Sequence, residues 1–165
     1  MTSMLSYYKT VADRMQELPA DEPGCWISCI APEDEEISAL IKRFNIDPDF
    51  FRAAMDDEES PRIDQDDNCT LIIVDIPVVE KQKSGKLFYF TRPLGIIMTQ
   101  KNVLTVSLQE NPVLDEFADG AVQDVQTNLK TRFVLQLMLR IASRYLMYLK
   151  QINRMSDTQH QLQHE

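Results

Sequence analysis

The side chains that could do chemistry in this chain are mainly carboxylates. Of the 26 Asp and Glu residues, 13 lie between Glu33 and Asp67, and the net charge of the 165-residue chain is −9. Basic residues do not cluster in the sequence, so a nucleic-acid footprint is missing and the charge balance favours cations as partners. A solvated acidic face explains the same composition, and charge alone leaves both interpretations open.

One acidic segment has the spacing of a calcium-binding loop. Residues 64–68 place Asp, Asp and Asn at alternate positions, like the first ligands of an EF-hand. However, Cys69 stands where the loop needs glycine, and Asp75 stands where a bidentate Glu is preferred. The apolar residues 71–74 also fall inside the loop. We therefore expect no calcium site there.

Catalytic chemistry has few candidate residues. Both histidines, His160 and His164, lie in the polar C-terminal tail, so the body of the chain has none to act as a general base or metal ligand. The four glycines are isolated, which excludes a P-loop and a dinucleotide fingerprint. Asp and Glu pairs could do acid–base work, but no feature singles out two of them. The sequence therefore predicts a protein that is not an enzyme.

The cysteines and the hydropathy indicate the cellular compartment in which the chain is expected. Cys25, Cys29 and Cys69 are odd in number, and their spacing is not that of a zinc knuckle or redox motif, which predicts free cytosolic thiols. No apolar run approaches the roughly 18–20 residues of a membrane span, and the N-terminus has no apolar signal-peptide core. As given, the chain is expected to be soluble, neither secreted nor membrane-spanning.

The apolar pattern predicts an α/β fold around one strand. Residues 71–74, Leu-Ile-Ile-Val, lie between turn residues and predict a central strand buried on both faces, whose ladder Pro77 should limit. The residues 5–8 and 11–18 predict two edge strands joined near Lys9 and Thr10. Further strands are predicted at residues 25–30, 88–91, 94–98 and 103–106, with turns at 84–85 and 99–102.

Prolines mark the starts of three predicted helices. Pro32 is the predicted first residue of one helix, with the acids 33–36 in its first turn. Asp47-Pro48 and Asn111-Pro112 each supply a cap and a first residue for the others, and Gly120 closes the third. Helix capping and solvation are a sufficient cause for the acids 33–36, with metal or partner binding as the alternative.

The last part of the chain predicts one long helix. From about Thr127 there is no Gly or Pro, and apolar residues cover most of the circumference, so the helix must be covered on more than one side. These residues are Phe133, Val134, Leu137, Met138, Ile141, Tyr145, Leu146, Leu149 and Ile152. About 35 residues give a length of about 50 Å, more than a domain of this size is across. We divide the chain into an α/β domain, residues 1–126, and a helical extension, residues 127–165.

The order of these pieces resembles the cytoplasmic N-terminal domain of CorA-type magnesium transporters, over nearly the whole chain. The matching parts are the strand at Trp26 with Pro32 and the acidic helix start, the run Asp56-Asp57-Glu58-Glu59-Ser60-Pro61-Arg62-Ile63 with Asp66-Asp67 and the strand after it, the strand pair at 94–97 and 103–106, and the long helix. The resemblance implies a three-layer α/β/α sandwich with a mixed, largely antiparallel sheet, followed by a long C-terminal helix.

The resemblance also implies a function. In that family a stalk helix and two membrane spans follow, forming a pentameric pore for magnesium, sometimes cobalt or nickel, and the cytoplasmic domain senses magnesium. This sequence ends before the stalk, the spans and the Gly-Met-Asn signature, so we expect a fragment from the cytoplasmic side of a cell-membrane protein, unable to conduct ions itself. The implied partners are divalent cations and further copies of the chain, a homopentamer in the full-length protein, with membrane contact only through the missing segments.

Glu80 is the candidate metal ligand that the resemblance singles out. The family's sensory sites bridge neighbouring subunits and pair a carboxylate in the loop after the central strand with an acid on the stalk. Glu80 lies at about that place, while its partner is missing from this chain. The expected ion is Mg²⁺, bound weakly and not required for folding. A solvent-exposed carboxylate without a ligand is the alternative, because hard cations need several oxygen ligands.

A stand-alone α/β scaffold or binding protein, docking partners through its C-terminal helix, is the alternative function. Its helix would need a second apolar layer, so we expect this fragment to self-associate through residues such as Phe133, Leu137, Tyr145, Leu149 and Ile152. Arg62, a cation among acidic neighbours at positions 57, 58, 64 and 66, is expected to be structural.

Overall fold

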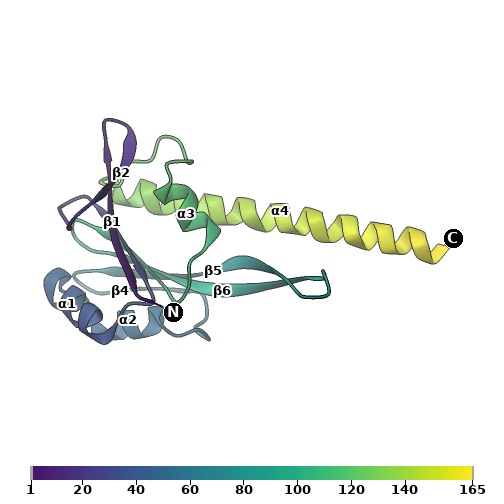
Figure 1. The fold of residues 1–165 in the computed structure, drawn as a ribbon. Helices are drawn as coiled ribbons and strands as arrows, with labels where there is room; N and C mark the ends of the chain where they lie inside the picture. Colours follow the sequence, from purple (N-terminus) through teal and green to yellow (C-terminus); the bar gives the residue numbers. More distant parts are fainter. Residues whose placement is uncertain (1, 165) are drawn as a thin grey trace.

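A seven-stranded mixed sheet forms the centre of the computed structural model, which describes residues 2–164 and the side chains of residues 2–158 (Figure 1). The strands are β1 (Met4–Val11), β2 (Arg14–Leu18), β3 (Trp26–Ile30), β4 (Arg62–Gln65), β5 (Thr70–Lys81), β6 (Leu87–Met98) and β7 (Val103–Ser107). Their order in the sheet is β2-β1-β3-β7-β6-β5-β4. Only β3 and β7 pair in parallel, which confirms the prediction of a mixed, largely antiparallel sheet.

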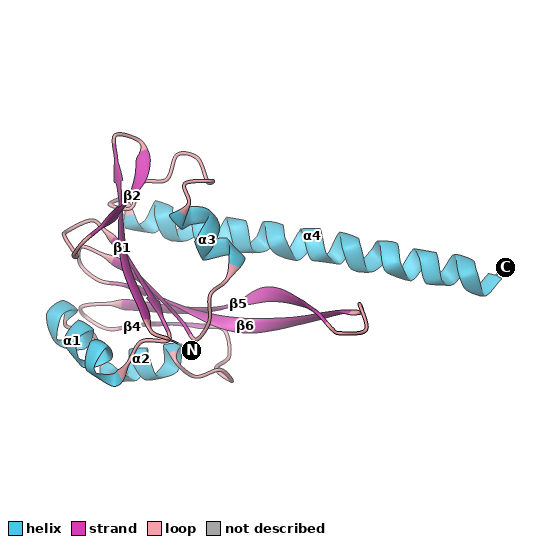
Figure 2. Cartoon of the chain, viewed as in Figure 1, coloured by secondary structure: helices cyan, strands magenta, loops and turns pink. Residues whose placement is uncertain are grey.

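Helices cover both faces of this sheet (Figure 2). They are α1 (Asp34–Phe44), α2 (Pro48–Ala54), α3 (Pro112–Ala118) and α4 (Lys130–His164). One apolar cluster joins α1 and α2 to one face, with Phe51 and Leu71 among its fully buried members. A second cluster joins α3 and α4 to the other face around Trp26 and Phe133. Successive residues of a buried strand belong alternately to the two clusters, because successive side chains of a strand point to opposite faces of the sheet.

The strand at residues 71–74 is buried on both faces as predicted, but it is not central. Leu71, Ile72 and Ile73 are less than 9% exposed. β5 is the second strand from one edge, because β4 pairs along its outer side over residues 70–73, while β7 occupies the middle of the order. A fully buried apolar run indicates coverage by helices on both faces, and it does not distinguish a middle strand from its neighbours.

β5 and β6 continue beyond the body of the sheet as a two-stranded arm (Figure 1). Pro77 does not end the ladder, contrary to prediction, because β5 runs on to Lys81. Past residue 73, β5 pairs only with β6, and its other side is a free edge of the sheet. Proline is tolerated on such an edge, because no further strand there needs its missing N–H. The two strands predicted at 88–91 and 94–98 are therefore one strand, and the turn at Ser84-Gly85 closes the arm as expected.

The N-terminal hairpin turns three residues later than predicted. Ala12 and Asp13 form its turn, and both have positive φ, 50° and 63°. Two positive φ values match the twist of a tight two-residue hairpin. The prediction of a turn near Lys9 and Thr10 was wrong. Of the two strands predicted at an edge, only β2 lies at one, because β1 lies between β2 and β3.

Two of the three predicted helix starts are confirmed, and the third needs a correction. Asp47 and Asn111 cap α2 and α3, and their prolines are the first helical residues, as predicted. α1 begins at Asp34, so Pro32 precedes its cap, Glu33, instead of starting the helix. The Glu33 N–H donates to the Glu36 carboxylate at 2.9 Å, which gives the acidic run a structural role.

The first half of α4 packs on the sheet through aromatic rings. Phe133 is fully buried, with its ring centroid 5.5 Å from that of Trp26 and 5.8 Å from that of Phe117. The helix begins at Lys130, and a turn in which Leu129 N–H donates to Gln126 O precedes it. No helix within residues 2–164 combines the length and the apolarity that a membrane crossing requires.

Substitution of Gly95 tests the seating of α2 on the sheet. A Cβ at Gly95 would lie 2.4 Å from Ala54 Cβ and 3.1 Å from Ala54 Cα, so Gly95→Ala should push α2 outward and lower the free energy of unfolding by about 1–3 kcal/mol. Gly85→Ala is the control, since a Cβ there meets nothing within 4 Å and only the φ of +84° opposes it. Urea unfolding measures both variants. A Gly95→Ala protein as stable as the parent would contradict this packing.

Candidate functional site

A groove lies between the β5–β6 arm and the segment that links β7 to α3. It encloses about 260 Å³, and its lining includes three acidic residues, Asp57, Glu80 and Glu110, and the basic residue Arg92. We call it the carboxylate groove. Asp57 follows α2 and Glu110 precedes α3, so the groove joins segments that are far apart in the sequence.

Glu80 lies in this groove on strand β5, opposite Phe88. The expectation of a loop position was wrong, because the arm extends β5 to Lys81. The Glu80 side chain is 59% exposed and accepts a hydrogen bond from Arg92 Nη2 at 3.4 Å. The same guanidinium lies 5.0 Å from the centroid of the Phe90 ring. Glu80 thus has one exposed, long ion pair, which a competing cation could replace at little cost.

The groove is not a closed metal site within one copy of the chain. Among the residues whose side chains the structure describes, no three His, Cys, Asp or Glu groups come together closely enough to hold a metal ion. Mg²⁺ prefers six oxygen ligands and keeps several of its waters. An ion in the groove would therefore remain largely hydrated or take further oxygens from another chain. The role of Glu80 as a ligand stays a prediction.

The other acidic motifs have structural uses. The Asp66 carboxylate accepts from the backbone N–H groups of Asn68 at 2.8 Å and Cys69 at 2.7 Å, which closes the turn between β4 and β5. Thr70 then starts β5, inside the segment that an EF-hand would need as loop. Arg62 pairs with Glu59 at 3.1 Å and Asp64 at 3.2 Å, and these exposed pairs contribute about 0–1 kcal/mol each.

The cysteines are poorly suited to act as nucleophiles. Cys25, Cys29 and Cys69 are buried free thiols, which confirms the prediction of free cysteines. Desolvation raises the pKa of Cys25 and Cys29, and it raises the pKa of Cys69 to about 11. Such thiols stay protonated at neutral pH and are poor nucleophiles. The side chains of His160 and His164 lie outside the residues described.

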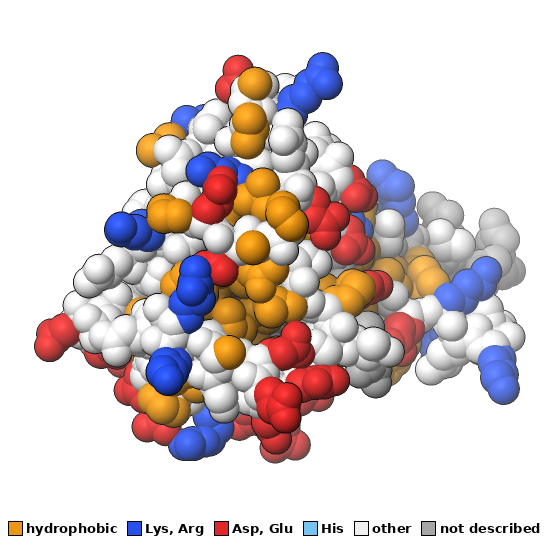
Figure 3. Space-filling view, turned by 60° about the vertical axis from the view of Figure 1, so that its left-hand side comes forward, with side chains coloured by type: hydrophobic (Ala, Val, Ile, Leu, Met, Phe, Trp, Pro, Cys, Tyr) orange, Lys and Arg blue, Asp and Glu red, His pale blue; other side chains and the backbone are white. Residues whose placement is uncertain are grey.

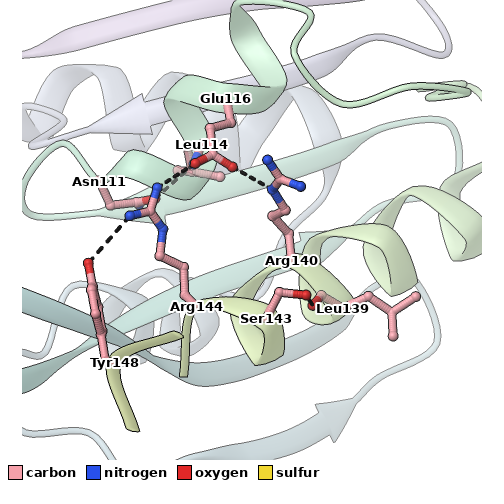
Figure 4. A network of polar contacts seen from close by, with 8 residues as sticks. All are labelled: Asn111, Leu114, Glu116, Leu139, Arg140, Ser143, Arg144 and Tyr148. Atoms are coloured by element: carbon pink, nitrogen blue, oxygen red, sulfur yellow. Dashed lines mark hydrogen bonds and ion pairs between the residues drawn. The ribbon is translucent and has the colours of Figure 1, made fainter. Parts of the chain in front are cut away.

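A second polar cluster joins α3 to α4, and the sequence reasoning did not find it (Figure 4). The Glu116 carboxylate accepts from Arg140 Nε at 2.5 Å and from Arg144 Nη2. Arg144 also donates to the hydroxyl of Tyr148 at 3.4 Å. The available signal was the spacing of the two arginines, which are four residues apart on a helix that is apolar over most of its circumference. A half-buried cation on such a helix needs an anion as its partner.

Glu116 is held as an anion by these contacts. Burial raises the pKa of its carboxyl, but the hydrogen bonds from Arg140 and Arg144 lower it by more, so the pKa lies below its ordinary value. The carboxylate and two guanidinium groups leave the cluster with one net positive charge. The cluster lies between two helices, so its role is to hold α3 against α4 and not to react with a substrate.

Comparison with known proteins identifies the family. The family model described as "CorA-like Mg2+ transporter protein" matches residues 21–164, which is most of the chain. The chain belongs to this CorA-like family. The match covers the elements from the loop before β3 through α4, including the carboxylate groove and the Glu116 cluster.

Individual CorA-like relatives are similar to this chain over different lengths. The cobalt/magnesium transport protein CorA of Methanocaldococcus jannaschii is 32% identical over 81 residues, 49% of this chain and 24% of that protein. The soluble domain of CorA from the same organism has a TM-score of 0.71 at 22% identity, covering 96% of this chain and 66% of that one. The ZntB cytoplasmic domain of Vibrio parahaemolyticus has a TM-score of 0.69 at 15% identity, covering 93% and 64%.

These identities and coverages support a conclusion about the fold of the chain, but not about its function. The two structural matches have low identity and show a shared fold. The chain spans about two thirds of the length of these solved domains, and the curated transporter is matched over about a quarter of its own length.

Removal of the Glu116 charge tests whether its ion pairs with Arg140 and Arg144 hold α3 against α4. Glu116→Gln should lower the free energy of unfolding at pH 7 by about 1–2 kcal/mol, because two charge-assisted hydrogen bonds weaken. A depressed folded-state pKa stabilises the protein above the ordinary value of 4.5, and this stability is lost as the pH falls through the folded-state pKa. The difference between variant and parent should therefore shrink on acidification.

Urea unfolding over a pH series measures this difference. Glu17→Gln, on the exposed edge strand β2, is the matched control and should leave stability nearly unchanged at every pH. A Glu116→Gln deficit that stays constant down to pH 3 would contradict the electrostatic account.

Proposed function

We propose that this chain is the cytoplasmic regulatory domain of a divalent-cation transporter and responds to Mg²⁺ or Co²⁺. The observation that carries the proposal is the CorA-like match along residues 21–164. The similar proteins described as a CorA soluble domain and a ZntB cytoplasmic domain support a position on the cytoplasmic side of a cell membrane. The domain itself would have no catalytic turnover.

The carboxylate groove is the proposed sensing surface. Three acidic residues line it, and among the side chains that the structure describes Glu80 has one polar contact, the long hydrogen bond from Arg92. In this proposal a hydrated Mg²⁺ displaces Arg92 from Glu80 and takes its remaining oxygen ligands from a neighbouring subunit. A sensor of this kind is incomplete in one copy and becomes complete only in the homo-oligomer, a homopentamer in the full-length protein.

Incompleteness in one copy predicts weak binding by this chain. Calorimetric titration with MgCl₂ should give a dissociation constant around millimolar, typical of carboxylate sites with few charges and little rigidity. Glu80→Gln should weaken the binding further, while Glu17→Gln, also an exposed strand glutamate, should not. A micromolar Mg²⁺ site in the single chain would contradict the requirement for a second subunit.

The parent reading frame tests the proposed function separately. The transporter reading requires two apolar spans of about 20 residues each after Glu165. A reading frame that stops at Glu165 would instead favour a stand-alone scaffold that docks partners through α4.

A further inference from the structure

One face of the β5–β6 arm carries a cation, two aromatic rings and a carboxylate in a row. In the antiparallel register Glu80 lies opposite Phe88, and Val78 lies opposite Phe90. Arg92 comes two residues after Phe90 on the same strand. Residues that pair directly across a ladder, or that lie two apart along a strand, point to the same face of the sheet. These side chains therefore share one face of the arm, with Arg92 and Glu80 at its two ends.

The Arg92 side chain extends over the Phe90 ring to reach Glu80. Its guanidinium carbon lies 5.0 Å from the centroid of that ring, and the centroids of Phe90 and Phe88 are 5.6 Å apart. A guanidinium above an aromatic face is attracted by the negative charge of the π-system. From this position Nη2 donates to Glu80 Oε1 at 3.4 Å. The aromatic ring therefore holds the cation beside the carboxylate, although the ion pair itself is long.

Arg92 is the one basic residue among the described residues that line the carboxylate groove, which also contains three acidic residues. The surrounding body is acidic as well, since residues 1–129 contain 24 acidic and 11 basic residues. Figure 3 shows acidic side chains gathered at the lower edge of the body, where α1 and α2 lie. The groove therefore attracts cations from solution, and Arg92 is a cation that is already there.

We propose that Arg92 is a tethered cation that competes with the divalent ion for Glu80 and so sets the ion concentration at which the groove responds. This inference rests on the proposed sensing function of the groove. A guanidinium stays protonated throughout the physiological pH range. Because it is attached to the neighbouring strand, its local concentration at Glu80 does not fall on dilution. An ion therefore binds Glu80 only by displacing the guanidinium.

The strength of the contact determines how large the competition is. An exposed ion pair of this kind changes a binding constant by at most roughly fivefold. Loss of the Arg92 charge would also remove the repulsion between the guanidinium and a divalent ion in the same groove. Arg92 therefore raises the ion concentration needed for binding without closing the groove to the ion.

Calorimetric titration of the whole chain with MgCl₂ tests this competition. Arg92→Gln should lower the dissociation constant of Mg²⁺ roughly 3- to 10-fold, because both the ion pair and the repulsion are lost. Arg92→Lys keeps the charge without the planar group and should lie between this variant and the parent. Arg62→Gln is the matched control. It removes one positive charge from exposed ion pairs with Glu59 and Asp64, outside the groove, and should leave Mg²⁺ binding unchanged.

The titrations distinguish this inference from the proposed function on which it rests. If Glu80→Gln weakens Mg²⁺ binding but Arg92→Gln binds no more tightly than Arg62→Gln, the groove senses the ion without competition from Arg92 and the inference is overturned. If neither the parent nor any variant binds Mg²⁺ at concentrations well above millimolar, the sensing function is wrong and the inference falls with it.

Nuclear magnetic resonance of the arginine Nε–H groups reports the displacement itself. Addition of Mg²⁺ to the parent should move the Arg92 signal toward its position in metal-free Glu80→Gln, because in both cases the guanidinium has lost its carboxylate. The Nε–H of Arg62, which donates to Glu59, is the internal control and should not move. An Arg92 signal that stays in place at saturating Mg²⁺ would overturn the inference, whatever the affinities of the variants.

Discussion

The packing of Phe133 between Trp26 and Phe117 is the contact on which the arrangement of this domain depends. It joins β3, α3 and α4, and the Trp26 indole N–H donates to Thr105 Oγ1 of β7 at 2.9 Å. Aromatic pairs with these separations contribute beyond their buried area. Because this contact fixes the rotation of α4, it also turns Arg140 and Arg144 toward Glu116. The leucines on another side of the helix, Leu135, Leu139 and Leu146, stay exposed.

The β5–β6 arm extends the support of α4 beyond the body of the sheet. The Tyr89 hydroxyl donates to Gln151 Oε1 at 3.3 Å, and its ring lies edge-on to Tyr148, with the centroids 5.8 Å apart. The same arm carries Glu80 and Arg92, which line the carboxylate groove. One β-ribbon therefore touches both the groove and the far half of α4. In the proposed sensor, a change at the groove would reach the helix through this ribbon.

Much of the fold could be predicted from local signals. The caps at Asp47 and Asn111, the glycine after α3 and the buried run at 71–74 each follow from a residue's own backbone preference or from an unbroken apolar pattern. Three of the errors have a common cause. The place of β5 in the sheet, the passage of the ladder through Pro77 and the strand position of Glu80 all depend on which strands lie next to β5, and that is set by contacts between distant segments.

The site was less predictable than the fold. Glu80 could be singled out only through a family resemblance, because one carboxylate among 26 has no distinguishing pattern. The Glu116 cluster depends on the approach of α3 to α4, which the spacing of the two arginines indicates without naming their partner. The exposed residues of α4 were hard to predict because the helix is apolar on most sides. Phe133 and Leu137, which were expected to mediate self-association, are fully buried in the domain's own core, whereas Leu139 is exposed. Only the structure shows which apolar residues its own sheet already covers.

Native-state hydrogen exchange along α4 tests the central claim, that the aromatic contact at Phe133 fixes the helix on the sheet. At low protein concentration, the amides around residues 133–141 should exchange only through global unfolding, with the same free energy as the buried strands β3 and β7. Amides beyond residue 155 should exchange far faster, by local fraying. Exchange of the 133–141 amides at a free energy well below the global value would show that α4 detaches by itself and would contradict the account.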